Sequence, residues 1–145
     1  MRALLDVNML IALLDPDHLF HEKAHLWWRE HQKEGWASCP VTENGLIRIV
    51  SLPKYSPDHP FSCMEVLDRL RAFTRQSDHT FLRESPSIRD EEIFRIGPHI
   101  RTAHLTDLYL LGLAVSHDLR LVTFDRGISL EPVCKAKPEH LVVLT

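Results

Sequence analysis

The chain has 145 residues, of which 44% are hydrophobic and 26% are charged. This composition excludes an intrinsically disordered chain, and no apolar run reaches the roughly 18 residues that a membrane span needs. The formal net charge of −3 lacks the basic excess of a general nucleic-acid binder. The length predicts one domain over residues 1–145.

The cysteines and the start of the chain indicate a cellular compartment. Cys39, Cys63 and Cys134 are odd in number and form no CxxC pair, so neither a disulfide framework nor a zinc knuckle is expected. The apolar residues before Asp6 are too few for a signal peptide. We therefore expect free thiols and a cytoplasmic location, with no membrane association.

The first half of the chain alternates short apolar runs with helical patterns. Residues 3–5 and 36–39 predict buried strands, and residues 9–14, 18–33 and 41–50 predict helices. Gly35 ends the second of these helices, and Pro40 ends the second strand. Residues 51–62 hold three prolines and predict a loop.

The second half continues the same alternation. We expect an amphipathic helix over 63–75, a strand over 80–82 and a weaker helix over 88–96. Residues 106–116 are apolar on nearly all sides and predict a buried helix. Residues 121–124 and 141–144 predict the last strands. The pattern as a whole predicts an α/β fold, a three-layer α/β/α sandwich around a mostly parallel sheet.

Four acidic residues fall at one edge of this predicted sheet. Asp6 and Asp125 follow strands, while Glu43 and Asp107 lie in the first turns of helices. In a parallel α/β sheet the carboxyl ends of strands and the following helix N-termini share one edge, where ligands bind. We therefore expect Asp6, Glu43, Asp107 and Asp125 to form one site.

Clustered carboxylates repel one another unless a cation neutralises them. Mg²⁺ or Mn²⁺ suits carboxylate ligands and can activate water against a phosphodiester. With four acids assigned to such a site, the net charge of the remainder rises from −3 to +1, so an RNA substrate is not excluded.

Each acid also has an ordinary alternative. Asp107 could stabilise a helix N-terminus, Asp125 could be a turn residue, and Glu43 could be a surface acid. Asn8 could be an N-cap. Asp6 is harder to explain in this way, because it interrupts a buried apolar start and a desolvated charge there needs a partner.

Several motifs together resemble the PIN domain, and most closely the toxin component of VapBC toxin–antitoxin pairs. They are LDVN at 5–8, PVTENGLIR at 40–48, HLTD at 104–107, VTFDRG at 122–127 and PEHLVVL at 138–144. Their order and spacing match the family across nearly the whole chain. The Pro-rich loop at 51–62 carries no family motif.

This resemblance implies an endoribonuclease that depends on Mg²⁺ or Mn²⁺, forms a homodimer and is inhibited by a cognate VapB-type antitoxin. By position, Asp6 and Asp107 match the principal metal ligands, and Glu43 and Asp125 match the remaining acids. Asn8 and Thr123 match polar supporting positions.

Two other functions compete with this one. A phosphatase of the haloacid dehalogenase type also has an Asp after its first strand, but it needs an acid two residues later, where this chain has Asn8. A non-catalytic PIN-like binding module should have lost acids, and here all four are present.

The histidines and tryptophans of residues 18–28 each allow two interpretations. His18, His21 and His25 could share a helix face and bind a transition metal, or they could be solvated or partly packed. Trp27 and Trp28 are adjacent, so we expect that they do not both face one core. One could belong to a partner interface, or it could pack in the ordinary way at the edge of a groove; we predict a groove for the antitoxin that involves the first two helices.

The two arginines that flank the acids in sequence also have two possible roles. Arg48 and Arg126 could contact RNA phosphate or could pair with the acids as counter-ions.

Overall fold

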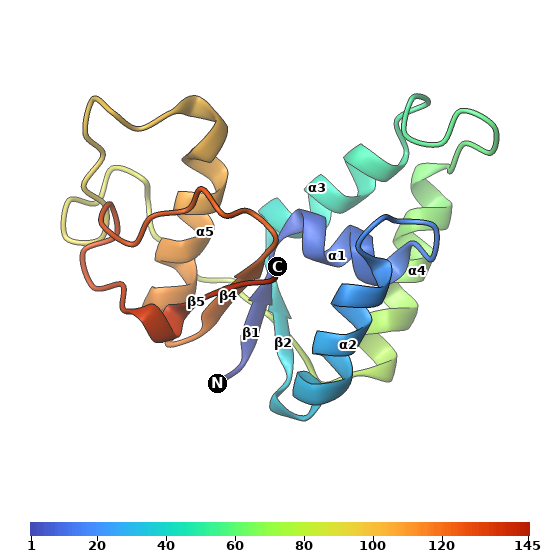
Figure 1. Cartoon of the computed structure of the whole chain (residues 1–145), viewed down its shortest axis with the longest axis horizontal. Helices are drawn as coiled ribbons and strands as arrows, with labels where there is room; N and C mark the ends of the chain where they lie inside the picture. Colours follow the sequence, from blue (N-terminus) through green and yellow to red (C-terminus); the bar gives the residue numbers. More distant parts are fainter.

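The computed structural model describes residues 1–145 and contains one five-stranded sheet at its centre (Figure 1). The strands are β1 (Ala3–Leu5), β2 (Trp36–Ser38), β3 (His79–Phe81), β4 (Arg120–Thr123) and β5 (Leu141–Val143). They lie in the order β3-β2-β1-β4-β5, and every neighbouring pair is parallel. The predicted parallel sheet is confirmed.

Helices cover both faces of the sheet, which completes the α/β/α sandwich (Figure 1). They are α1 (Val7–Leu14), α2 (His21–His31), α3 (Pro40–Val50), α4 (Cys63–Gln76) and α5 (Leu105–Ser116). Short 3₁₀ turns occupy Gln32–Glu34, Thr102–His104 and Pro138–His140. None of the helices combines the length and the apolar character that crossing a membrane demands.

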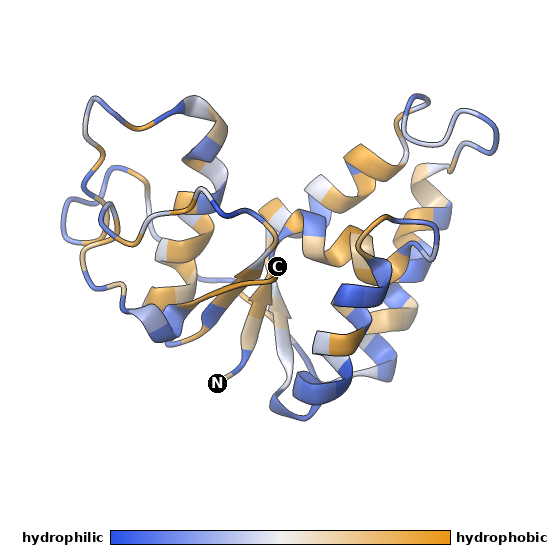
Figure 2. Cartoon of the chain, in the orientation of Figure 1, coloured by the Kyte–Doolittle hydropathy of each residue, from blue (hydrophilic) through white to orange (hydrophobic).

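Alternation along β1 explains the two layers. Ala3 and Leu5 belong to the hydrophobic cluster with α1 to α4, whereas Leu4 belongs to the cluster with α5. Successive strand residues point to opposite faces, so a fully apolar strand serves both cores. The hydropathy colouring shows the apolar residues gathered on the inner sides of the helices (Figure 2).

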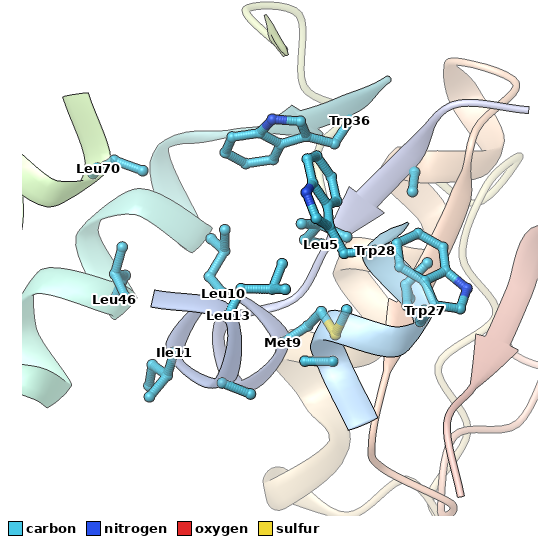
Figure 3. Close-up of a cluster of buried hydrophobic side chains, with 14 of the residues drawn as sticks. Leu5, Met9, Leu10, Ile11, Leu13, Trp27, Trp28, Trp36, Leu46 and Leu70 are labelled. Carbon is cyan, nitrogen blue, oxygen red and sulfur yellow. The ribbon is translucent and has the colours of Figure 1, made fainter. Parts of the chain in front are cut away.

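The core on the α1 side is built around α1 itself. Met9, Leu10, Ile11 and Leu13 are buried, and Leu5 and Leu46 lie beside them (Figure 3). Helix α1 contacts both α2 and α3, so little of its surface remains for water. This packing fixes the start of α1, where Asp6 is located.

The expectation that Trp27 and Trp28 do not both face one core was wrong. Trp27 and Trp28 are 8% and 9% exposed and belong to the same core cluster (Figure 3). Trp27 stacks on His31 at 4.6 Å between ring centroids, and Trp28 contacts Phe73 of α4 at 5.1 Å. Successive helix positions diverge by about 100°, but neighbours on two sides of α2 cover both rings. Ordinary packing accounts for both indoles, and the antitoxin groove on the first two helices stays a prediction.

The predicted helix over 88–96 is also wrong. The segment forms only turns, and Phe94 makes an antiparallel bridge with Val133. The Phe94 ring is 4% exposed and packs against α5, where a Cβ added to Gly112 would lie 2.2 Å from it. Tertiary pairing therefore satisfies backbone groups that a helix would have bonded locally, and it overrides a weak propensity.

The strand order positions the functional edge. The chain builds β1, β2 and β3 outward in one direction and then returns to place β4 and β5 on the other side of β1. The order thus reverses between β1 and β4, and crevices at such a reversal are the usual ligand sites of open parallel sheets. Asp6 and Asp125 follow these two strands.

Candidate active site

Asp6 is the innermost acid of the site. It is 2% exposed, ends β1 and forms the N-cap of α1. Its Oδ1 accepts a hydrogen bond from the Met9 backbone N–H at 2.7 Å, and its Oδ2 accepts one from the Thr123 hydroxyl. Asp6 rather than Asn8 is therefore the helix cap, and the helix begins at Val7.

The environment of Asp6 disfavours its ionised form. Burial raises the pKa of Asp6 to about 6, and the nearby charge of Asp125 adds to the rise. The hydrogen bonds from Thr123 and Met9 oppose that rise without cancelling it. A carboxylate at this position consequently gains from any cation that approaches it.

Asp125 is held by the turn that follows β4. Its backbone N–H donates to Thr123 Oγ1 at 3.0 Å, and its own Oδ1 accepts from the Gly127 N–H at 2.7 Å. The Thr123 hydroxyl thus contacts both Asp6 and Asp125. These hydrogen bonds place Thr123 between the two acids, and its supporting role in a metal site stays a prediction.

Asp107 approaches from the other side of the sheet, in the first turn of α5. Partial burial, followed by the charge of Asp6 and a hydrogen bond with Asp125, raises the pKa of Asp107 to about 7. Three aspartates separated by up to 119 positions in sequence therefore interact at one sheet edge. The convergence expected for these three residues is found.

Glu43 lies in the first turn of α3 but faces other partners. Its Oε2 accepts from Ser38 Oγ at 2.5 Å, and His79 Nε2 lies 2.8 Å from the same hydroxyl. It is not among the charges that raise the pKa of Asp6 or Asp107. The structure brings three of the four predicted acids together and holds the fourth on a separate hydrogen-bond chain.

Sequence reasoning missed this chain of Ser38 and His79. Ser38 is fully buried at the end of β2, so a polar residue closing an apolar strand was an available signal. His79 reaches it from β3, which pairs with β2. Burial lowers the pKa of His79, and the charge of Glu43 partly offsets that decrease.

The remaining predicted residues stand at the periphery. Asn8, Arg48 and Arg126 are exposed. Neither arginine forms a salt bridge, so the counter-ion alternative is not found. Asn8 makes no side-chain hydrogen bond to an acid, and its supporting role stays a prediction.

The three histidines near α2 do not form a metal site. His21 Nδ1 lies 2.7 Å from the Ala12 carbonyl oxygen, and His25 Nε2 lies 3.2 Å from that of Leu13. These rings bond the last turn of α1, where carbonyl groups lack helical partners. His18 Nδ1 accepts from the Phe20 N–H at 3.0 Å, so each of the three rings has a hydrogen-bond partner within the chain.

The aspartates fit a hard divalent cation by their chemistry. They supply only carboxylate oxygens, the ligands that Mg²⁺ and Mn²⁺ prefer. The raised pKa values of Asp6 and Asp107 record a repulsion and a desolvation that such a cation would relieve. No three His, Cys, Asp or Glu side chains are close enough to form a ready-made metal site, so binding would require rotamer adjustment.

Comparison with known proteins agrees with this fold. The PIN domain family model matches residues 3–130, a span that includes all four acids. Ribonuclease VapC44 of Mycobacterium tuberculosis is 44% identical over 144 residues, covering 99% of this chain and 100% of that protein. Ribonuclease VapC38 of the same organism is 36% identical over 129 residues, covering 87% and 86%.

A third relative extends the pattern. Ribonuclease VapC39 of Mycobacterium tuberculosis is 35% identical over 134 residues, covering 89% of this chain and 92% of that protein. The dehalogenase alternative is not supported by any of these matches. The fold, the acidic edge and these similarities show that the chain belongs to the PIN domain family and, within it, to the VapC group.

Proposed function

We propose that this chain is a metal-dependent endoribonuclease, the toxin of a type II toxin–antitoxin pair. The observation that carries the proposal is the meeting of Asp6, Asp107 and Asp125 at the reversal point of a PIN-domain sheet. The similarity to proteins named ribonuclease VapC supports RNA as the substrate. Residues 1–145 would form a single PIN domain.

In this proposal the aspartates hold Mg²⁺ or Mn²⁺, and Glu43 completes the acidic set. The ion would supply activation of water and neutralisation of charge on the scissile phosphate. No serine, cysteine or histidine nucleophile is required.

Hydrogen bonds from other residues of the chain orient the acids at this edge of the sheet. Thr123 donates to Asp6 and accepts from the Asp125 N–H, so one hydroxyl orients two acids. Met9 N–H anchors the other oxygen of Asp6. Ser38 donates a hydrogen bond to Glu43 Oε2 and so orients that carboxylate. Asn8 would add a polar contact to water or substrate.

The partners follow from the VapC relationship. We propose RNA as substrate, a cognate VapB-type antitoxin as inhibitor and a second copy of the chain in a homodimer. Arg48 and Arg126 are exposed and free of salt bridges, which makes them available to RNA phosphates. The cytoplasm is the expected place of action.

The decisive experiment is cleavage of a total-RNA pool by purified protein with Mg²⁺, with Mn²⁺ and with EDTA. Asp6→Asn and Asp107→Asn test the site, and Asp58→Asn in the exposed 51–62 loop is the matched control. Discrete metal-dependent cuts that persist in the control and disappear in both site variants are expected. Cutting that continues in EDTA or in both site variants would contradict the proposal.

A further inference from the structure

A cavity of about 280 Å³ lies next to the aspartates, on the α5 side of the sheet. One wall comes from the segment that leads into α5, with His99, Arg101 and His104. The other comes from the turn after β4, with Gly127, Ser129 and Glu131. Both segments can be followed in Figure 1 beside α5.

The cavity shares its boundary with the acidic site. Gly127 donates its N–H to Asp125 Oδ1, and a Cβ added to Gly127 would lie 3.0 Å from His104 Nε2 and 3.2 Å from Asp125 Oδ1. Leu108 lines the cavity and directly follows Asp107 in α5. A molecule seated here would therefore reach the edge of the catalytic aspartates.

The lining combines features that suit one nucleotide. Leu108, Ile128 and Pro132 offer apolar surface against which a base face can pack. Ser129 and Glu131 offer polar groups to a base edge, because a carboxylate accepts hydrogen bonds from the amino groups of bases. The volume of about 280 Å³ lies just below the range typical of small-molecule sites, so the cavity can take one nucleotide at most.

The charged groups of the lining form no salt bridge within the chain. Arg101 is exposed, and neither Arg101, His99, His104 nor Glu131 forms a salt bridge within the chain. A guanidinium with no internal carboxylate partner is well suited to phosphate oxygens. The sequence motifs include His104 but not His99, Arg101 or Glu131, and only the tertiary structure brings the two loops together.

We propose that this cavity binds the nucleotide next to the scissile phosphate and so sets which RNA sequence is cut. The position of the nucleotide beside a scissile phosphate rests on the proposed ribonuclease function, but the binding of a nucleotide can be tested without cleavage. Arg101 holds a phosphate oxygen, the apolar wall packs on the base, and Glu131 and Ser129 read its edge.

The first experiment titrates ¹⁵N-labelled protein with AMP, GMP, CMP and UMP in EDTA and follows backbone amides by NMR. Saturable shifts are expected for amides within 97–104 and 127–131. Arg101→Ala should weaken binding about three- to tenfold, the effect of one charge-assisted contact at a partly exposed site. Arg29→Ala, an exposed arginine on α2, is the matched control and should leave binding unchanged.

Several results would overturn the subsite. They are the absence of saturable shifts with all four nucleotides, shifts confined to other surfaces, and equal affinities of the Arg101 and Arg29 variants. Glu131→Gln gives an independent check, because it should change the ranking of the four nucleotides while leaving the fold intact.

The second experiment measures cleavage of short RNAs that differ in the bases beside the cut. Arg101→Ala and Glu131→Gln should raise KM or relax base preference at one position, with kcat less affected. Unchanged KM and preference in both variants would refute the subsite even if the wild type cuts RNA. A wild type that binds mononucleotides in the cavity but cuts no RNA would instead refute the proposed function and leave the nucleotide site supported.

Discussion

Replacing Asp6 with Asn should stabilise the metal-free protein while it abolishes activity. The pKa of Asp6 is raised from 3.8 to about 6. At neutral pH the ionised carboxylate of Asp6 is therefore less stable in the native fold than in the unfolded chain. Two pKa units correspond to about 3 kcal/mol. Asn is nearly isosteric, remains a good N-cap and carries no charge.

One interaction opposes this gain. The Thr123 hydroxyl donates to Asp6 Oδ2, and an amide nitrogen at that position would force it to reorient. A lost neutral hydrogen bond costs about 1 kcal/mol. The net expectation is about 2 kcal/mol of added stability at pH 7.5, or about 4–8 °C in Tm for a chain of this size.

The difference in stability between Asp6→Asn and the wild type depends on pH. Because the native pKa is raised, the folded wild type binds more protons than the unfolded chain between about pH 4 and pH 6. The stability of the wild type therefore falls as pH rises through that window, whereas the variant lacks this contribution. At pH 4 the variant should be no more stable than the wild type, and the difference should grow up to about pH 6.

This difference in stability can be measured by thermal unfolding in EDTA at pH 4, 5, 6 and 7.5, followed by circular dichroism. Asp58→Asn serves as the exposed control and should follow the wild type throughout. Adding Mg²⁺ at pH 7.5 should raise the Tm of the wild type and not that of Asp6→Asn, because a ligand stabilises only the fold that binds it. A variant less stable than wild type at pH 7.5 in EDTA, or a difference that does not vary with pH, would refute the reasoning.

Three further substitutions test how the site is supported. Ser38→Ala should lower kcat by releasing Glu43 and cost about 1–3 kcal/mol in urea unfolding, because Ser38 Oγ donates to that carboxylate at 2.5 Å in a buried setting; unchanged kcat would exclude a positioning role. Gly45→Ala should destabilise by about 1–3 kcal/mol, since the new Cβ would lie 2.7 Å from Val7 Cγ2 between α3 and α1; a urea midpoint equal to wild type would contradict this close approach. Trp27→Ala should cost about 3–5 kcal/mol as a core truncation, and unaltered stability in urea would return this indole to a surface role.

Local pattern was sufficient for most of the fold. Apolar runs such as 3–5 and 121–124 identified buried strands because a parallel sheet covered on both faces tolerates few polar side chains. The apolar stretch at 106–116 likewise identified α5 as a buried helix, and Leu110, Leu111 and Leu113 are fully buried. Where the pattern was weak, as over 88–96, a bridge to Val133, distant in the sequence, decided the outcome.

Three of the four predicted acids could be placed together from sequence because parallel topology places strand ends and helix starts at one edge. Asp6 and Asp125 lie at strand ends and Asp107 in a first helical turn, and they interact as expected. Glu43 also lies in a first turn, but its orientation depends on Ser38 and on His79 from a neighbouring strand. Chain position does not determine a side-chain rotamer when its partners come from elsewhere in the fold.

The sequence by itself determined the alternation of strands and helices, and with it the edge at which the aspartates gather. Periodicity and burial are properties of neighbouring residues, so they can be read along the chain. Only the tertiary structure decided that both tryptophans are buried, that Glu43 is held by Ser38, and that two loops enclose a cavity beside Asp125. Those features depend on which surfaces meet across large sequence separations, and a linear pattern carries little information about such pairings.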